Sequence, residues 1–205
     1  MITQRKAAAN IRKVLQQATG EELAAGNDWY QAANERALMM ALDFGISIEA
    51  VAYIIAALSP SVRWEQNVTA ARKLLEAVVA GESTDLVLPG YPNNVAKAKT
   101  IARLAHARFS PEQWKKHLKG PKVVEFAENI INPSRCQQVT LDTHAISVAS
   151  GKRFTTKSAP ELRIAEFTRI SAAYVKVAAE YNISPNQCQA ITWLVWRRLH
   201  KGRKR

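Results

Sequence analysis

Leu118-Lys119-Gly120-Pro121-Lys122 ends one predicted helix and begins the next. Glycine suits the turn after a helix and proline suits the first helical position, so the stretch predicts a helical hairpin over about residues 112–131. Twenty residues after Lys122 stands Asp142, within Val139-Thr140-Leu141-Asp142-Thr143-His144. A carboxylate weakens the attraction of a basic chain to a polyanion, which suggests that Asp142 has a chemical purpose.

The composition favours an anionic partner. The 205 residues include 29 Lys and Arg against 17 Asp and Glu, a formal charge of +12. Such a balance favours nucleic acid or an anionic membrane surface. No apolar run approaches the roughly 20 residues that span a bilayer, and the first residues do not resemble a signal peptide. We therefore expect nucleic acid, no membrane, and a cytoplasmic location.

Cysteine and histidine usage indicates no metal site. Cys136 and Cys188 are too few for a disulfide scaffold or a four-cysteine iron–sulfur cluster. The four histidines lack metal-ligand spacing. We expect a reducing compartment, no metal, no iron–sulfur cluster and no other cofactor.

The apolar spacing of three to four residues predicts an all-α chain, and the length suits one domain or a single fold of two lobes over residues 1–205. Residues 48–58 are nearly all apolar, which is typical of a central helix. The basic tail 197–205 suits either a disordered solubilising tail or a phosphate-contacting arm. Further helices are predicted over 4–18, 28–44, 63–80, 93–108, a short stretch after Ser110-Pro111, 121–131, 142–150, Ser158 to about Tyr181, and from Ser184-Pro185 to the tail.

Four pieces of residues 35–150 occur in the order found in the helix-hairpin-helix DNA glycosylase superfamily, the endonuclease III-like group, and resemble it together. The first is an apolar helix that ends at Leu58-Ser59-Pro60 and is followed by a helix with an early asparagine, Asn67; the second is Gly90-Tyr91, which leads to Lys97-Ala98. The third is the hairpin 118–122, which is similar to a contracted form of the family's Leu-Pro-Gly-x-Gly-x-Lys motif. The fourth is the segment 139–145, which is similar to the family's Val-Asp-Thr-His segment.

The resemblance implies a two-lobed helix-hairpin-helix glycosylase fold and a DNA N-glycosylase that acts on a flipped pyrimidine in duplex DNA. It leaves open whether the base is modified and whether an AP-lyase step follows. In it, Asp142 stabilises the oxocarbenium-like sugar or acts as general base, and Lys122 has the place of the Schiff-base nucleophile. The relatives expected to be most similar are virus-encoded enzymes acting on thymine or modified pyrimidines, which implies a bacterial host's cytoplasm.

The chain departs from the family pattern at several positions. The hairpin lacks its second glycine, Pro121 stands where an N–H would help, and Ser147 replaces an expected arginine. The iron–sulfur cysteines of the family's C-terminus are absent. The resemblance is therefore to a divergent member.

Other residues are candidates for contacts with DNA. Gly120 and Lys122 are predicted to anchor a phosphate. Further DNA contacts are predicted for Lys119, Lys97, Arg63 and Arg197, and Ser61 lies near the place where related enzymes insert a gap-filling side chain. Base-pocket candidates are Trp64, Asn67 and His144. Several candidates have a plain structural alternative: Asp142 suits a helix cap, Lys122 a solvated lysine, Asn67 a surface asparagine, and Trp64 and His144 core packing. The last helix carries a stripe whose plainest interpretation is also core packing, with Arg197 extending outward: Gln189, Trp193, Trp196 and Arg197.

Three other functions fit the same residues. The chain could be a non-catalytic DNA-binding protein on this scaffold, as the lost hairpin glycine suggests. It could modify a base by transfer or ligation without excision, as viral relatives make plausible. It could also be a helical RNA-binding module, which comparison of duplex DNA with structured RNA at matched salt would distinguish.

Overall fold

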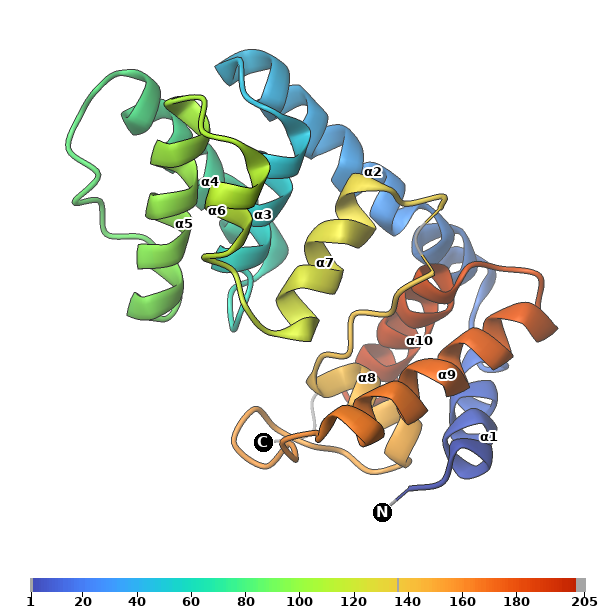
Figure 1. Ribbon diagram of the computed structural model, residues 1–205. Helices are drawn as coiled ribbons and strands as arrows, with labels where there is room; N and C mark the ends of the chain where they lie inside the picture. Colours follow the sequence, from blue (N-terminus) through green and yellow to red (C-terminus); the bar gives the residue numbers. More distant parts are fainter. Residues whose placement is uncertain (1, 136, 202–205) are drawn as a thin grey trace. The chain divides into compact units, whose positions relative to one another are not determined.

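The computed structural model describes residues 2–135 and 137–201 (Figure 1). Within these ranges every regular element is a helix, which confirms the all-α prediction. Cys136 and residues 202–205 of the basic tail lie outside them. The helices are α1 (Gln4–Leu15), α2 (Gly20–Phe44), α3 (Ile48–Leu58), α4 (Trp64–Val79), α5 (Pro92–His106), α6 (Pro111–Lys115), α7 (Pro121–Ile131), α8 (Thr143–Ser150), α9 (Ile164–Glu180) and α10 (Pro185–Leu199).

The chain divides into two compact units. The terminal unit comprises Met1–Ala32 and Pro133–Arg205, and the central unit comprises Ala33–Asn132. Helix α2 contributes residues to both. Each unit buries apolar side chains of its own.

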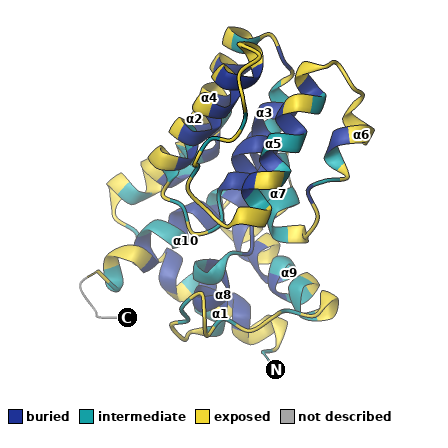
Figure 2. Cartoon of the chain, turned by 90° about the vertical axis from the view of Figure 1, so that its left-hand side faces the viewer, coloured by how far each residue is buried: buried dark blue, intermediate teal, exposed yellow. Residues whose placement is uncertain are grey.

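Helix α3 is the centre of the central unit, as its apolar sequence predicts. Every residue from Ala50 to Leu58 is buried (Figure 2). The Ser47 side chain accepts a hydrogen bond from the Ala50 N–H and so caps the first turn. Helices α4, α5, α6 and α7 pack against α3. This packing fixes where α6 and α7 lie within the central unit.

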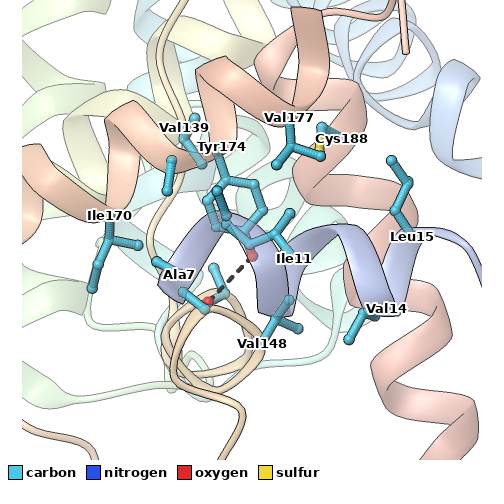
Figure 3. Close-up of a cluster of buried hydrophobic side chains, with 14 of the residues drawn as sticks. Ala7, Ile11, Val14, Leu15, Val139, Val148, Ile170, Tyr174, Val177 and Cys188 are labelled. Carbon is cyan, nitrogen blue, oxygen red and sulfur yellow. Dashed lines mark hydrogen bonds between the residues drawn. The ribbon is translucent and has the colours of Figure 1, made fainter. Parts of the chain in front are cut away.

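The core of the terminal unit is formed by α1, α8, α9 and α10 (Figure 3). Tyr174 of α9 is completely buried, and its hydroxyl donates to the Ala145 carbonyl of α8 at 3.2 Å. Burial raises the pKa of this hydroxyl. The Asn10 amide of α1 donates to the Ala149 carbonyl at 2.8 Å, so side chains from two helices hold α8 in place.

The structure corrects the predicted bounds of the first two helices, 4–18 and 28–44. Helix α1 ends at Leu15, and α2 continues through Gly26 from Gly20 to Phe44. A Cβ on Gly26 would lie 2.7 Å from the Cα and 2.8 Å from the backbone nitrogen of Ile191 in α10. Gly26 therefore allows two helices to approach closely, and it is not part of a turn.

The structure also corrects the predicted start of α9 at Ser158. Ser158 instead closes a turn with Thr155, whose N–H donates to the Ser158 hydroxyl at 2.8 Å. The helix begins at Ile164, where the Glu166 carboxylate accepts from the Arg163 N–H at 3.2 Å. The Ser158 hydroxyl, which would suit a helix cap, is therefore used in the loop before α9. Glu166 in the first turn of α9 satisfies the Arg163 N–H in its place.

Candidate active site

Asp142 is the N-cap of α8. Its backbone is extended and its Oδ1 accepts from the Ala145 N–H at 2.8 Å. Buried Val139 and Leu141 anchor the segment before it, and the Asp142 side chain is half-buried. The plain alternative of a helix cap is therefore observed, and it uses one of the two carboxylate oxygens.

Hydrogen bonds tie the segment before Asp142 to two other helices. The Tyr30 hydroxyl of α2 lies 3.0 Å from Oγ1 of Thr140 and 3.1 Å from Oε1 of Gln189 in α10. All three side chains are buried. Such a buried polar network fixes the backbone that leads into the α8 N-terminus.

An aromatic cluster consisting of Trp29, His144, Trp193 and Arg197 lies in the same unit. The His144 ring stands edge-on to Trp193 at 6.3 Å between centroids, and Trp29 stands edge-on to Trp193 at 6.5 Å. The Arg197 guanidinium lies over the Trp193 ring, 4.4 Å from its centroid. Since His144 is two residues after Asp142, the cluster belongs to the same end of α8.

No spacing in the sequence connects this cluster with Asp142. The one sequence signal for it is the stripe on the last helix, whose plainest interpretation is core packing. That interpretation is correct for Gln189 and Trp196, which are buried. Arg197 is exposed, in agreement with the prediction that it extends outward, and Trp193 is only half-buried, so these two side chains can meet a ligand.

The central unit carries the predicted hairpin residues. Helices α6 and α7 lie on either side of Gly120, whose φ of 107° is a conformation that favours glycine. Gly120 is the N-cap of α7 and provides no side-chain cap, and Pro121 at the first position has no N–H to donate. Lys119 and Gly120 are exposed and Lys122 is half-buried.

A polar and aromatic contact set attaches this hairpin to the central core. Trp114 of α6 is buried and stands edge-on to Tyr53 of α3 at 5.5 Å. The Tyr53 hydroxyl donates to Oε1 of Glu128 in α7 at 3.0 Å. Burial first, and the Glu128 charge second, raise the pKa of Tyr53 and keep it neutral. The Lys115 ammonium lies 5.4 Å from the Tyr53 ring centroid. These contacts hold both hairpin helices on α3.

The remaining predicted residues of the central unit have different environments. Ser61 has a φ of 65°, and its hydroxyl lies 3.0 Å from the Tyr91 hydroxyl. Asn67 is an interior residue: its amide donates to the Ile55 carbonyl at 3.0 Å, while its Oδ1 has no hydrogen-bond partner among the residues that the structure describes. Trp64 and Lys97 are half-buried and Arg63 is exposed. Asn67 therefore joins α4 to α3.

Residues 1–200 match DUF7178, a family of unknown function. The chain belongs to DUF7178. Comparison with curated proteins and with solved structures finds no match.

Two general properties of the DUF7178 chain bear on its ligands. In residues 2–135 and 137–201, no three His, Cys, Asp or Glu side chains are grouped so that they could hold a metal ion. Across the same ranges no single helix has the length and hydropathy of a membrane span, although α2 and α3, bent by 117°, meet that test of length and composition when taken together.

Sequence reasoning missed Glu125 of α7, one helical turn from Lys122. The Glu125 side chain is half-buried, and its Oε2 is buried without a hydrogen-bond partner in residues 2–135 and 137–201. Burial raises the pKa of this carboxyl from 4.5 to about 7. Residues three apart share a helix face, so Glu125 is an acid–base group on the side of α7 that carries Lys122. Its burial depends on tertiary packing, which local sequence does not indicate.

We expect Glu125→Gln to remove a pH-dependent loss of stability. The folded-state pKa of about 7 exceeds the ordinary 4.5, so the stabilising contribution of protonated Glu125 is complete below pH 4.5 and is lost as the pH rises through 7. Between pH 5 and 8 the wild type should lose about 1–2 kcal/mol of unfolding free energy relative to Glu125→Gln, after allowance for partial exposure. Urea denaturation measures this. Glu76→Gln, at an exposed position of α4, should follow the wild type.

Proposed function

We propose that this DUF7178 protein is a DNA N-glycosylase of the helix-hairpin-helix type that acts on a flipped pyrimidine in duplex DNA. Asp142 carries the proposal. It is a half-buried carboxylate at a helix N-terminus, two residues from a side chain of the aromatic cluster, in a chain of charge +12. The ordered resemblance of residues 35–150 to glycosylases supports it. The expected partner is duplex DNA, in the cytoplasm of a bacterial host.

The proposed chemistry needs a negative charge beside the sugar. As the N-glycosidic bond breaks, positive charge develops on the sugar ring, and a fixed carboxylate stabilises that charge. Only Oδ1 of Asp142 is used by the cap, so Oδ2 is the oxygen that would face the sugar or orient an attacking water. Exposed Lys119 and the Gly120 turn suit phosphate contacts, which position a duplex without reading its sequence.

Lys122 is the proposed nucleophile if the enzyme also cleaves abasic DNA. Its neutral amine would attack C1′ as the C1′–base bond breaks and the base leaves with a proton. The C1′–O4′ bond would then open, with a proton passing from the amine to O4′, and the resulting imine would be reducible by borohydride. Trapping on duplexes that carry uracil, modified thymines or cytosines, or an abasic site tests this step. We expect a covalent adduct with wild type and with Lys119→Ala, and none with Lys122→Ala. Base release without an adduct in any variant would make the enzyme monofunctional.

A non-catalytic DNA-binding protein is the second candidate. Two observations favour it: Asp142 already has a structural task as the α8 cap, and Pro121 removes an N–H from the hairpin turn. On this alternative the duplex is bound tightly and no free base is released from any substrate in the panel. A base altered but kept in the strand would instead indicate modification without excision. Mass spectrometry of the strand and of the released material separates these results.

A further inference from the structure

We propose that Trp193 and Arg197 of α10 form a stacking site for an unpaired nucleobase of DNA. The inference rests on the proposed function only in taking DNA as the ligand. It concerns α10 of the terminal unit and needs neither Asp142 nor Lys122.

The two side chains are held in one arrangement. Trp193 is in edge-on contact with Trp29 of α2 and His144 of α8, so its ring is fixed by two other helices. Arg197 lies over that ring at 4.4 Å, one helical turn further along α10. A half-buried indole with an exposed guanidinium over it presents a preformed flat cationic surface.

The neighbouring arginine shows what a purely structural arginine does in this helix. Arg198 donates from Nε to Oε1 of Glu22 at 2.7 Å and from Nη2 to the Gln17 carbonyl at 2.7 Å. None of the ion pairs among residues 2–135 and 137–201 uses Arg197. Its charge is therefore available to a ligand, and its orientation is set by the indole.

A nucleobase fits this surface better than a phosphate alone. A phosphate needs only charge, which exposed lysines such as Lys201 supply without an aromatic partner. Unpaired bases stack on aromatic rings and on guanidinium planes, and each stacked base adds substantially to affinity. A paired base inside a duplex has no free face, so the site should favour bulged or flipped nucleotides.

The test uses two labelled duplexes of one sequence, one with a bulged thymine and one with a bulged abasic nucleotide at the same position. Their backbone charge is identical, so the ratio of their Kd values isolates the base. By fluorescence anisotropy we expect wild type to bind the bulged thymine about 10-fold more tightly, as stacking of one base predicts. Trp193→Leu and Arg197→Lys should reduce the ratio to near 1.

Lys176→Ala is the matched charge control, because Lys176 is exposed on α9 of the same unit. It should weaken binding to both duplexes equally and leave the ratio at wild-type level. Arg197→Lys keeps the charge at an exposed position, so it decides the matter if Trp193→Leu does not fold. An unchanged ratio in Arg197→Lys would overturn the proposal. Tight wild-type binding with a Kd ratio of 1 would overturn the stacking site but leave DNA as the ligand. No binding to either duplex would overturn the stacking site and the proposal that the protein binds DNA.

Discussion

Asp142→Asn is expected to slow base release by a factor of about 10²–10⁴ while α8 remains folded. Asparagine is as good an N-cap as aspartate, so the bond to the Ala145 N–H is kept. What is lost is the negative charge that would oppose the sugar cation. Removing that charge from a chain of +12 should also tighten binding to duplex DNA. Single-turnover base release and anisotropy on the same duplex measure the two effects.

Asp28→Asn is the matched control for charge, since Asp28 is exposed on α2 in the same unit. It should leave base release unchanged. Asp142→Ala provides a control for the cap, because it should cost about 1 kcal/mol of stability as well as activity. If Asp142→Asn released base at the wild-type rate, Asp142 would be a cap alone and a different group would have to stabilise the sugar cation.

The helices that could be predicted are those whose signals are local. Ser47 before an apolar run predicts the start of α3, and Gly45, with a φ of 62°, ends α2 as its position suggests. Ser110-Pro111 predicts α6, whose cap is completed by the Gln113 side chain accepting from the Ser110 N–H at 2.9 Å. In each case neighbours within four residues satisfy the helix end, so the sequence contains the whole interaction.

The two wrong boundaries have a different cause. Gly26 is read as a turn from local sequence, but its partner is Ile191, far along the chain. Ser158 suits a helix cap, yet its hydroxyl is already bound to Thr155. Glycine and serine each occur in several kinds of local structure, so the sequence alone does not decide whether they belong to a helix, a cap or a turn. That depends on the residue they contact in the folded chain.

The candidate site also depends on contacts between residues that are far apart in the sequence. Asp142 and Lys122 were found because each lies in a short motif. The contacts of His144 with Trp193, and of Trp193 with Trp29, join residues from three helices, and no spacing in the sequence predicts them. The raised pKa of Glu125 likewise follows from burial by distant residues. Motifs therefore indicate the reacting groups, while packing determines what surrounds them.

Gly26→Ala is expected to destabilise the protein by roughly 2–4 kcal/mol, although alanine favours helices over glycine by about 1 kcal/mol. The added methyl group would meet the backbone of Ile191 within 2.8 Å, and backbone atoms cannot turn aside as a side-chain end can. The free energy of unfolding from urea denaturation measures the loss. Gly20→Ala is the control: nothing lies within 4 Å of its added Cβ, so it should be neutral or slightly stabilising.

The double variant Gly26→Ala with Ile191→Ala separates backbone overlap from side-chain overlap. Truncating Ile191 removes its Cγ1 but leaves its Cα and nitrogen in place, so it should not restore stability. Recovery to the level of Ile191→Ala alone would mean that α2 and α10 are less closely packed than the structure has them. Because Gly26 is one turn from Trp29 and Ile191 is two residues from Trp193, this approach sets the spacing of the two indoles. Gly26→Ala should therefore also lose the preference for a bulged thymine over an abasic bulge, even at temperatures where the variant is folded.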